Sequence, residues 1–504
     1  MNANLFDILA RSITDAGATA IETLDGTRIS YADLVARTGR MANALVSLGV
    51  KPDDRVAVQV EKSVEAIILY LATARAGAVF LPLNTGYTAA EIAYFIDDAE
   101  PALFVCDPSR AADLTEAAEK AGARMVTLDA KGKGSLTDAA ATAPAGFDTV
   151  PRDKDDLAAL LYTSGTTGRS KGAMLTHGNL VSNALSLRET WRYTDTDVLI
   201  HALPIFHTHG LFVATNVTLF SGASMIFLPK FDIDRIFELM GRATVLMGVP
   251  TFYVRLLEDD MLNVETTANM RLFVSGSAPL LAETHRKWRA RTGHAILERY
   301  GMTETNMNTS NPYDGERVAG TVGLPLPGTE VIVTDPETGA DLPQGQIGMI
   351  EVRGANVFKG YWRMPEKTAA ELRANGFFIT GDLGRIDDKG YVHIVGRGKD
   401  LIITGGYNVY PKEIEAEIDE IPGVLESAVI GIAHKDFGEA VTAVVVPTGT
   451  SSLTEAAIVA ALEGRLARFK QPKRLMFVTE LPRNTMGKVQ KNLLRDQYAN
   501  LYRK

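Results

Sequence analysis

Apolar residues recur along the first 160 residues with two alternating spacings. Residues 30–50 (SYADLVARTGRMANALVSLGV) have apolar positions three and four apart, which predicts a helix with Ser30 as its N-cap and Gly49 near its end. The runs RVAVQV and AVFLPLN are short and apolar, so they predict strands, and KSVEAIILYLATARAG between them predicts a crossover helix. Strand–helix–strand repetition implies a parallel sheet covered by helices on both faces.

The same pattern continues from about residue 157 to 325, where LAALLYT, ASMIFLP, ATVLMGVP, MRLFVSGS and HAILERYG are candidate buried strands. Between about 326 and 395, TEVIVTD, GMIEVRG and YVHIVG are short and partly alternating, which predicts a smaller β-rich subdomain. The polar segment GRGKD at 396–400 suits a hinge. The sequence therefore predicts an α/β protein with a large N-terminal domain of doubly wound sheets (1–395) and a smaller, mobile α+β C-terminal domain (396–504).

Composition excludes several classes of protein. A net charge of −9 over 504 residues argues against a nucleic-acid partner. The longest apolar stretch is interrupted by Arg75, so no membrane association is expected. Asp7 interrupts the apolar run at the N-terminus, which is untypical of a signal peptide, and we expect a cytoplasmic protein. The single cysteine, Cys106, allows no internal disulfide and no cysteine-based zinc site.

The charge is unevenly distributed. Residues 464–504 contain eleven Lys or Arg and two acidic residues. A basic tail suits a polyanionic partner such as a nucleotide or CoA. It is also typical of a solvated lysine-rich lobe, and composition alone favours this second interpretation.

A loop of small and hydroxyl-bearing residues follows the apolar run LAALL. Tyr162 to Gly172 has the sequence YTSGTTGRSKG, in which glycines permit turns that expose backbone N–H groups and Lys171 adds a positive charge. These groups suit a phosphate chain, although the glycine–lysine spacing differs from that of the Walker loop. Such a segment is often a flexible linker, but its place between a buried strand and a possible helix favours phosphate binding.

This loop resembles the signature loop of the adenylate-forming superfamily, which contains acyl-CoA synthetases, peptide-synthetase adenylation domains and luciferases. Further motifs follow in that family's order, so the resemblance covers nearly the whole chain. It implies an enzyme that uses ATP and Mg²⁺ to convert a carboxylic acid into an acyl-adenylate, with CoA as the co-substrate that receives the acyl group.

The motif YGMTE (Tyr300–Glu304) matches the family's adenine and magnesium motif. The resemblance implies that Tyr300 stacks on adenine, that Thr303 contacts phosphate, and that Glu304 helps to hold Mg²⁺ with Thr167. Mg²⁺ prefers carboxylate oxygens, although read alone Glu304 would be an exposed surface acid. The nucleotide-binding residues implied in this way are Thr163, Ser164, Gly165, Thr166, Thr167, Gly168, Lys171, Ser277, Ala278, Tyr300, Gly301, Met302, Thr303, Asp382 and Arg397.

Two more motifs resemble the family's ribose and hinge segments. Asp382 in TGDLGRID corresponds to the acid that holds the ribose hydroxyls, and a carboxylate can accept two hydrogen bonds from a diol. Arg397 is implied as a second ribose or phosphate contact. Lys399 and Asp400 are implied as the interdomain hinge.

The C-terminal part supplies a CoA tunnel and a catalytic lysine by the same resemblance. Gly405 and Gly406 match the loop that lines the pantetheine tunnel, where glycine lets the backbone approach a thin chain. Lys488 in PRNTMGKVQK matches the adenylation lysine, whose ammonium can stabilise negative charge on phosphate oxygens. This segment also resembles one that is acetylated in some acyl-CoA synthetases, so a lysine acetyltransferase acting on Lys488 is a predicted partner. The predicted catalytic residues are Lys488, His207 and Glu304.

The segment HALPIFHTHG places His207 and His209 two residues apart, so that on a strand they would share a face. Two histidines could bind a metal, but no third ligand is nearby, so no zinc site is expected. In the family this segment lines the acyl pocket. His207 is the candidate to contact substrate or phosphate, and His209 is expected to be structural.

Two arginines indicate which acid is bound. Arg255 in VPTFYVRLL shares a helix face with Thr251 and Phe252 if Pro250 begins a helix, and Arg299 in HAILERYG faces away from Glu298 on a strand. A buried guanidinium without a partner costs several kcal/mol, so a protein acid or a second substrate carboxylate must pair with each. The motifs resemble malonyl-CoA synthetases, which implies malonate as substrate, with methylmalonate as a second one, bound by Arg255, Arg299 and His207.

Three other interpretations remain open. A ligase for aryl or medium-chain monocarboxylic acids would leave both arginines as structural ion pairs. An adenylation domain would need a separate carrier protein, since the chain ends sixteen residues after Lys488. A non-catalytic nucleotide-binding protein is the third, and the matches at Lys171, Glu304, Asp382 and Lys488 argue against it.

Overall fold

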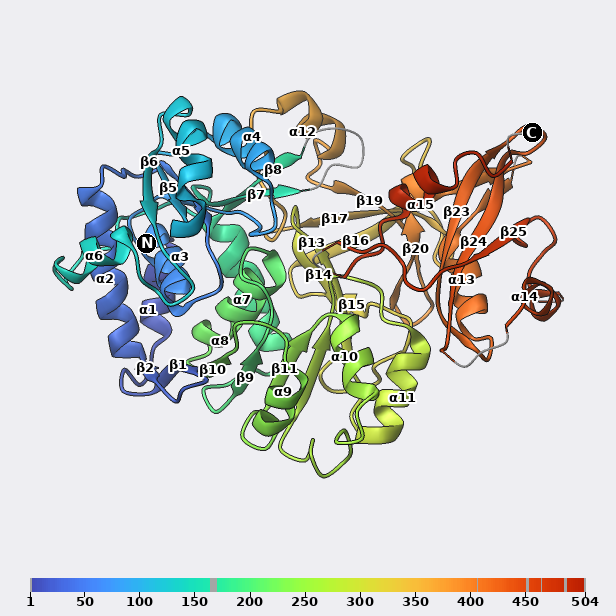
Figure 1. Cartoon of the computed structure of the whole chain (residues 1–504), viewed down its shortest axis with the longest axis horizontal. Coiled ribbons are helices and arrows are strands. Elements are labelled where there is room, and N and C mark those ends of the chain that lie inside the picture. Colours follow the sequence, from blue (N-terminus) through green and yellow to red (C-terminus); the bar gives the residue numbers. More distant parts are fainter. Residues whose placement is uncertain are drawn as a thin grey trace.

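The polypeptide forms layers of helices and sheets that confirm the predicted α/β fold class (Figure 1). The structure, a computed structural model, describes residues 2–163, 170–405, 407–449, 453–463, 465–484 and 487–502. Within these residues a seven-stranded sheet has the order β18-β8-β7-β4-β3-β5-β6. In that order its strands are Gly360–Tyr361, Lys171–Thr176, Leu157–Thr163, Val79–Pro82, Arg55–Gln59, Leu103–Cys106 and Arg124–Thr127.

A nine-stranded sheet in the same described part has the order β15-β14-β13-β12-β11-β9-β10-β1-β2. In that order its strands are Leu324–Pro325, Asn306–Ser310, Leu297–Met302, Leu272–Ser275, Val245–Gly248, Val198–His201, Ser224–Phe227, Thr19–Thr23 and Arg28–Ser30. Strands β9 to β13 pair in parallel, as the sequence predicts. β14 then returns antiparallel to β13, so the turn between them lies at the carboxyl edge of the parallel strands.

Alternating residues of each sheet belong to different hydrophobic cores. One shared core lies between the two sheets and contains α1 (Leu5–Ser12), α2 (Tyr31–Ser47), α3 (Val64–Arg75), α6 (Ser135–Ala141), α7 (His177–Thr190) and α8 (Asn216–Phe220). The outer face of the seven-stranded sheet is covered by α4 (Ala89–Ala99) and α5 (Ala111–Lys120), which follows the short turn η1 (Pro108–Arg110). The outer face of the nine-stranded sheet is covered by α9 (Ile233–Met240), α10 (Pro250–Leu257) and α11 (Ala282–Thr292). Both sheets are therefore covered on both faces, as buried parallel strands require.

Local sequence signals account for many helix ends. Ser30 accepts a hydrogen bond from the Asp33 amide and Asp33 returns one to Ser30, so α2 begins with the predicted N-cap in a full capping box. Helix α10 begins at Pro250, as predicted, because proline suits the first helical turn. The possible helix after the phosphate loop is present as α7, which begins at His177, but a strand comes before it. Residues 171–176 form β8, which pairs antiparallel with β7, and its buried Ala173 and Leu175 lie in the sheet beside β7.

A four-stranded antiparallel sheet follows, in agreement with the change of pattern after residue 326. Its order within the described residues is β16-β17-β19-β20, with bounds Thr329–Thr334, Gly348–Gly354, Phe378–Ile386 and Val392–Arg397, and α12 (Pro365–Glu371) precedes β19. The short turn η3 (Gly398–Asp400) then leads to a different sheet. The predicted hinge thus lies between two sheets, while the exact domain boundary stays a prediction.

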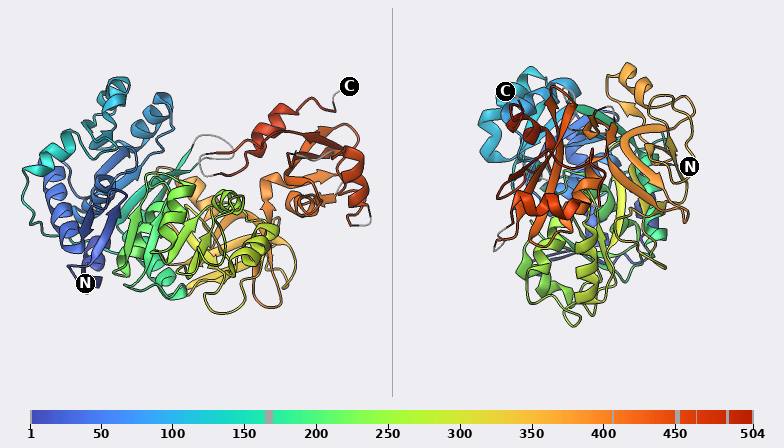
Figure 2. Two further views of the ribbon diagram at one scale, coloured as in Figure 1. Left: turned by 60° about the horizontal axis from the view of Figure 1, so that its bottom comes forward. Right: turned by 90° about the vertical axis from the view of Figure 1, so that its right-hand side faces the viewer.

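The C-terminal lobe stands at one end of the molecule, opposite the N-terminus (Figure 2). Its sheet has the order β22-β21-β24-β23, and β25 pairs with β24. These strands are Tyr407–Val409, Ile402–Thr404, Gly438–Pro447, Val424–His434 and Arg474–Phe477. One face packs against α13 (Pro411–Asp419) and α14 (Glu455–Leu462), and the other packs against α15 (Lys491–Gln497).

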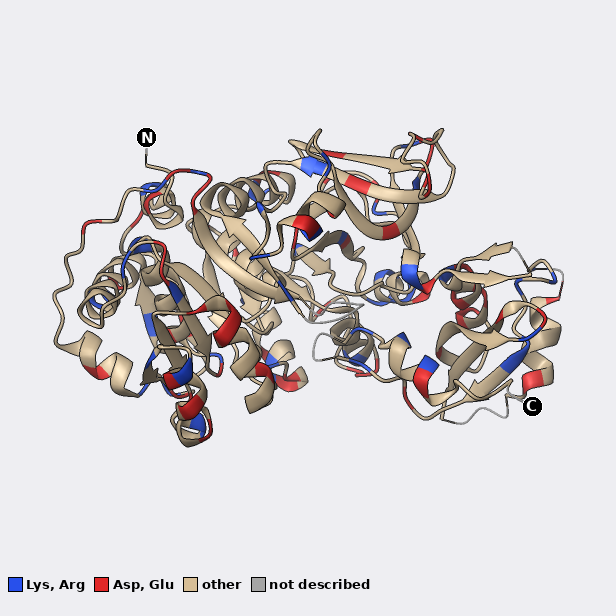
Figure 3. Ribbon diagram, turned by 90° about the horizontal axis from the view of Figure 1, so that it is seen from above, with Lys and Arg blue, Asp and Glu red and all other residues tan. Residues whose placement is uncertain are grey.

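Five basic residues of the tail form ion pairs within this lobe. Figure 3 shows acidic and basic segments together on it. The ion pairs are Arg465–Glu417, Lys470–Glu413, Arg483–Glu426, Lys491–Glu415 and Arg495–Asp400. These ion pairs neutralise part of the charge of the tail, and Lys488 belongs to none of them. Among the described helices, none combines the length and apolar character that crossing a bilayer requires.

Candidate active site

The ends of the predicted phosphate loop lie opposite each other across a β-hairpin. Thr163 ends β7 and pairs with Lys171, which begins β8. The Lys171 ammonium lies 3.4 Å from Oε2 of Glu371 and 4.1 Å from the centre of the Tyr361 ring. The predicted residues Ser164, Gly165, Thr166, Thr167 and Gly168 lie outside the described residues.

Glu304 is buried at the turn that follows β13, so it is not the exposed acid that its sequence alone would suggest. The Tyr361 hydroxyl lies 3.1 Å from Oε1 of Glu304 and 2.7 Å from Oε2 of Glu371. Burial raises the pKa of Glu304, while Lys171 opposes that change. Lys171, Glu304 and Glu371 therefore surround one tyrosine, next to the predicted phosphate loop.

Tyr300, Asp382 and Arg397 form a second group at the same edge. The Tyr300 hydroxyl donates to Oδ2 of Asp382 at 2.5 Å, and the Arg397 Nε lies 2.8 Å from Oδ1 of the same carboxylate. Asp382 is buried, and its carboxylate raises the pKa of Arg397. Strands β13, β19 and β20 therefore bring together the three residues predicted to hold the nucleoside.

The backbone around these side chains is tightly packed. A Cβ at Gly301 would lie 1.9 Å from the Asn306 carbonyl oxygen, so only glycine fits where β13 turns into β14. Met302 and Thr303 are half-buried on this turn. The other predicted segment contains Ser277, which has a φ of 72°, followed by half-buried Ala278.

Lys488 reaches this region from the C-terminal lobe. A Cβ at its neighbour Gly487 would lie 3.5 Å from the Thr251 side chain of α10, so the lysine segment adjoins the N-terminal domain. Lys488 is exposed in the structure. Even so, partial loss of hydration, and after it the charge of Arg397, lower the pKa of Lys488 to about 8. Burial, the charge of Arg299 and the charge of Lys488 together lower the pKa of His207 to about 4.

Arg299 is 3% exposed, and its guanidinium lies against the backbone at Gly276, where an added Cβ would be 2.4 Å from Cζ. Its Nε and Nη2 atoms have no hydrogen-bond partner among the described residues. Burial lowers its pKa to about 9. Glu298, the adjacent acid, faces the other way and accepts a hydrogen bond from the Leu280 amide, as expected from strand alternation.

His207 and His209 do not lie on a strand. Strand β9 ends at His201, and His209 is the first residue of η2 (His209–Thr215), a π-helical turn. The His209 amide donates to Nδ1 of His207 at 3.4 Å, and His209 Nδ1 lies 3.2 Å from Ser277 Oγ. Both imidazoles therefore lie at the same edge as Arg299, and Arg299 lowers the pKa of each.

Comparison with known proteins identifies the family. Residues 11–362 match the AMP-binding enzyme family, and residues 413–488 match the AMP-binding enzyme C-terminal domain. The chain belongs to the AMP-binding enzyme family. It is similar to "Malonate--CoA ligase" of Arabidopsis thaliana (35% identity, 88% of this chain and 78% of the relative) and to "Feruloyl-CoA synthase" of an Amycolatopsis species (37% identity, 96% of each chain).

Among solved structures, this AMP-binding enzyme is similar to ATP-bound MatB from Rhodopseudomonas palustris, with 67% identity, a TM-score of 0.99 and 100% of each chain covered. The apo form of MatB has the same identity and coverage but a TM-score of 0.88. At equal identity, the coordinates here are therefore more similar to the ATP-bound relative than to the apo one. In this arrangement Lys488 lies near enough to Asp382 and Arg397 for their charges to affect its pKa.

Arg255 of this AMP-binding enzyme does not share the buried environment expected for both arginines. It is exposed on α10, with Cζ 5.9 Å from the centre of the Phe231 ring, because Tyr253 and Leu256 occupy the buried face. No ion pair or hydrogen bond joins it to the rest of the described chain. Thr251, one turn earlier, adjoins Gly487, so Arg255 shares the helix face that the Lys488 segment approaches. Its contact with substrate stays a prediction.

The predicted hinge and CoA residues lie on the other side of Arg397. Lys399 is exposed in η3, and Asp400 forms an ion pair with Arg495 of α15 at 2.9 Å. Gly405 has a φ of 57°, and its amide donates to the Phe437 carbonyl at 2.8 Å. Gly406 lies outside the described residues.

Sequence reasoning missed Tyr361 and Glu371 of the segment GYWRMPEKTAAE. They contact Lys171 and Glu304 only because β18 pairs with β8. A tyrosine and an acid ten residues apart carry no spacing signal that could have indicated this contact.

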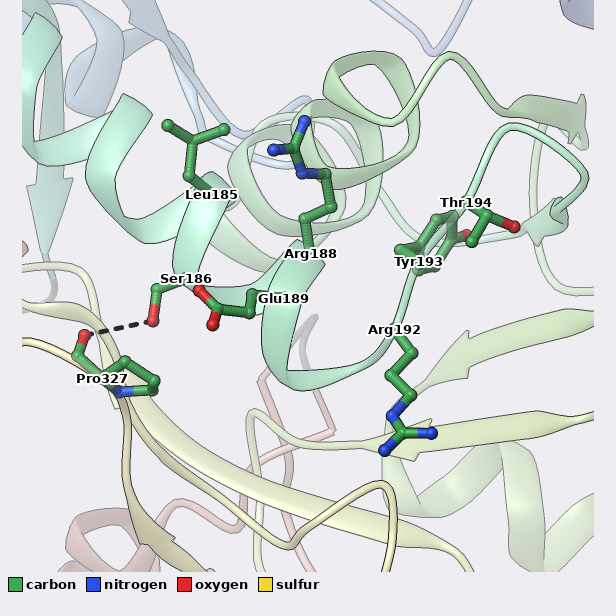
Figure 4. Close-up of a pocket in the computed structure, with 8 residues that line it drawn as sticks. All are labelled: Leu185, Ser186, Arg188, Glu189, Arg192, Tyr193, Thr194 and Pro327. Atoms are coloured by element: carbon green, nitrogen blue, oxygen red, sulfur yellow. Dashed lines mark hydrogen bonds between the residues drawn. The ribbon is translucent and has the colours of Figure 1, made fainter.

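An open cavity lies away from these groups. It measures about 550 Å³ beside α7, and Ser186 in its wall donates to the Pro327 carbonyl at 3.2 Å (Figure 4). Its lining residues are Leu185, Ser186, Arg188, Glu189, Arg192, Tyr193, Thr194 and Pro327. None of the predicted site residues lines it, so the active-site assignment rests on the side-chain cluster.

Proposed function

We propose that this AMP-binding enzyme is a malonate–CoA ligase that converts malonate, ATP and CoA into malonyl-CoA, AMP and pyrophosphate by way of malonyl-adenylate. The observation that carries the substrate is Arg299. Its guanidinium is buried and lacks an acidic partner among the described residues. Leaving a buried cation unpaired costs several kcal/mol, so the site is suited to a ligand that brings an anion. The distal carboxylate of malonate is that anion.

In the first half-reaction a carboxylate oxygen of malonate attacks the α-phosphorus of ATP. A P–O bond forms to the substrate, and the bond between the α-phosphorus and the bridging oxygen breaks, so pyrophosphate leaves. Negative charge builds on the phosphate oxygens, and the Lys488 ammonium stabilises it. Tyr300 holds the adenine, Asp382 and Arg397 hold the ribose, and Lys171 contacts the phosphates. Malonate is supported here by the names of relatives such as the Arabidopsis ligase as well as by Arg299.

The site fits Mg²⁺ in the form that accompanies ATP. The described residues contain no group of three or more potential metal ligands, so this part of the protein does not supply a dedicated metal cage. Mg²⁺ commonly uses one or two carboxylates plus phosphate oxygens and water, and the buried Glu304 beside Lys171 provides one carboxylate. Glu304 would hold the ion with Thr167, and the ion would neutralise charge on the phosphates.

In the second half-reaction the CoA sulfur, as thiolate, attacks the acyl carbon and the bond to AMP breaks. Gly405 and Gly406 line the path of the pantetheine chain, and the C-terminal lobe rotates about Lys399 and Asp400 to present them. The TM-scores to the ATP-bound and apo relatives support two arrangements of the parts in this family. Acetylation of Lys488 by a lysine acetyltransferase, and a cytoplasmic location, stay predictions.

The substrate is tested by measuring pyrophosphate release with malonate, methylmalonate, acetate, butyrate and ferulate, with and without CoA. Malonate should give the highest kcat/KM, and methylmalonate should follow it, because one methyl group is discriminated by only ~1–3 kcal/mol. Release that depends on CoA for turnover separates a CoA ligase from a carrier-loading domain. A preference for butyrate or ferulate over malonate would restore the monocarboxylate ligase.

The carboxylate contact is tested with Arg299→Leu. Removing one partner of a buried ion pair typically costs ~3–5 kcal/mol, so malonate kcat/KM should fall roughly 10²–10³-fold while butyrate is spared. Arg75→Leu is the matched control, because Arg75 is a buried arginine that binds the carbonyls of Val35 and Phe147 in the central core. The control should lower Tm without changing selectivity. Equal losses on malonate and butyrate in Arg299→Leu would make this arginine structural.

A further inference from the structure

His209 is as deeply buried as Arg299, at 1% exposure, although only a structural role was expected for it from the sequence. Its Nδ1 has a partner in Ser277 Oγ at 3.2 Å, while its Nε2 has no partner in the described part of the chain. Buried polar atoms are rarely left unpaired, because an unmade hydrogen bond costs about 1–3 kcal/mol. An orphaned Nε2 close to the unpaired guanidinium of Arg299 therefore points to a ligand atom.

The protonation of this imidazole follows from its surroundings. Burial and the charge of Arg299 lower the pKa of His209, so the ring is neutral and carries one N–H. If the Ser277 hydroxyl donates to Nδ1, the proton resides on Nε2, because the hydrogen bond at one ring nitrogen fixes the state of the other. His209 then presents one N–H donor from Nε2.

Backbone geometry places this donor beside the arginine. The Arg299 guanidinium lies against Gly276, where an added Cβ would be 2.4 Å from Cζ and 2.6 Å from Nε. Ser277, the next residue, holds His209. Two successive residues of the loop after β12 therefore contact Arg299 and His209, and both side chains end in polar atoms without partners among the described residues.

We propose that His209 is a specificity-determining residue that donates a hydrogen bond from Nε2 to the distal carboxylate of the substrate, in a subsite shared with Arg299 and fixed by Ser277. The inference rests on the proposed function and extends it. Arg299 supplies the charge, and His209 supplies a directed neutral donor. Because a carboxylate has about four acceptor positions, one such group can accept from both residues.

This arrangement discriminates by leaving donors unpaired. A monocarboxylate such as butyrate of the same length places a methyl group where both donors need an acceptor. A site built to hydrogen-bond a polar group rejects the analogue that lacks it, because the buried donors of the site stay unpaired. His209 therefore adds to selectivity without adding a second positive charge that would also attract inorganic anions.

The test measures malonate and butyrate kinetics of His209→Leu and His209→Gln. The leucine variant should lose about 10–10²-fold in malonate kcat/KM, mainly through KM, in line with one buried hydrogen bond to a charged group. Butyrate kcat/KM should stay within about three-fold or rise, and KM for ATP should not change. The glutamine variant keeps an N–H donor and should recover part of the malonate activity.

His177→Leu is the matched control. His177 is a second fully buried histidine, its Nδ1 accepts from the Leu5 amide at 3.0 Å, and its Nε2 also lacks a partner among described residues. It begins α7, in the core between the sheets, and has no assigned part in the reaction. Its loss should lower Tm and leave the malonate-to-butyrate ratio unchanged.

Proportional loss of malonate and butyrate activity in His209→Leu, or a glutamine variant no better than leucine, would overturn the inference. If the leucine variant does not fold, the glutamine variant and Ser277→Ala provide the test. The alanine removes the hydroxyl that holds the proton of His209 on Nε2, so Ser277→Ala should also lower the preference for malonate over butyrate. Failure of the proposed function is distinguishable, because it would appear as a wild-type preference for butyrate and an unselective Arg299→Leu. Selective loss in Arg299→Leu without any in His209→Leu would refute the role of His209 alone.

Discussion

Lys488 offers a quantitative test of the adenylation mechanism through the pH dependence of its charge. The surrounding protein and the nearby Arg397 lower its pKa from 10.5 to about 8. A lysine with this pKa is about 90% protonated at pH 7 and about 10% at pH 9. If only the ammonium stabilises the phosphate charge, kcat/KM for adenylation should fall about ten-fold per pH unit above pH 8.

The assay is malonate-dependent exchange of pyrophosphate into ATP, which reports the first half-reaction. Because kcat/KM reports the ionisation of the free enzyme, the alkaline limb should appear near pH 8. Lys488→Arg keeps a charge that does not titrate below pH 12. The alkaline fall of kcat/KM should therefore disappear in this variant, even if its kcat/KM at neutral pH is lower than that of the wild type. Lys488→Ala should lose ~10²-fold at pH 7, as expected for an electrostatic stabiliser, and also lose the limb.

Lys399→Arg is the control, because partial loss of hydration and the charge of Arg397 also lower the pKa of this exposed lysine. This variant should keep the wild-type limb. Preformed malonyl-adenylate and CoA should still react in Lys488→Ala, since that step builds no charge on phosphorus. A limb near pH 8 that persists in Lys488→Arg, or equal losses in the two half-reactions of Lys488→Ala, would refute the reasoning.

Three further predictions concern groups around the site. Burial raises the pKa of Glu298 to about 8, above its unfolded value of about 4.3. The stability that protonated Glu298 contributes at low pH is therefore lost as the pH rises through 8. Glu298→Gln should flatten the fall of Tm between pH 5 and 9, and an unchanged slope of Tm against pH would contradict this. Glu371→Gln removes the carboxylate that pairs with Lys171 and so frees the lysine for ATP phosphates. KM for ATP should fall about two- to five-fold, because a partly exposed ion pair contributes up to ~1 kcal/mol. A higher KM for ATP would count against the contact. Arg495→Ala frees Asp400 of the hinge and should slow adenylation about two- to five-fold while sparing thioester formation; stopped-flow measurement of both steps checks this, and equal slowing would indicate general damage.

The predicted strands and helices match the structure closely where the pattern is long. The β3–α3–β4 unit and strands β10 to β13 occur where apolar runs and helical spacing predict them. The helix expected after the phosphate loop begins only at His177, because the six residues before it pair with β7, and six residues of mixed polarity suit either a helix or a strand until such pairing is known. The order of motifs also led to the AMP-binding family without any structural information.

The sequence by itself determined the fold class and the family, and it supplied the prediction of the nucleotide-binding residues. Each of these depends on local spacing or on motifs within one segment, and both are written along the chain. Only the tertiary structure decided which charged groups have partners. Arg255 and Arg299 had equal standing in the sequence, yet one is exposed over Phe231 and the other is buried against Gly276 without an acid among the described residues. Whether a polar group is satisfied depends on atoms from segments far apart in sequence, such as Ser277 beside His209, and no local pattern encodes that distance.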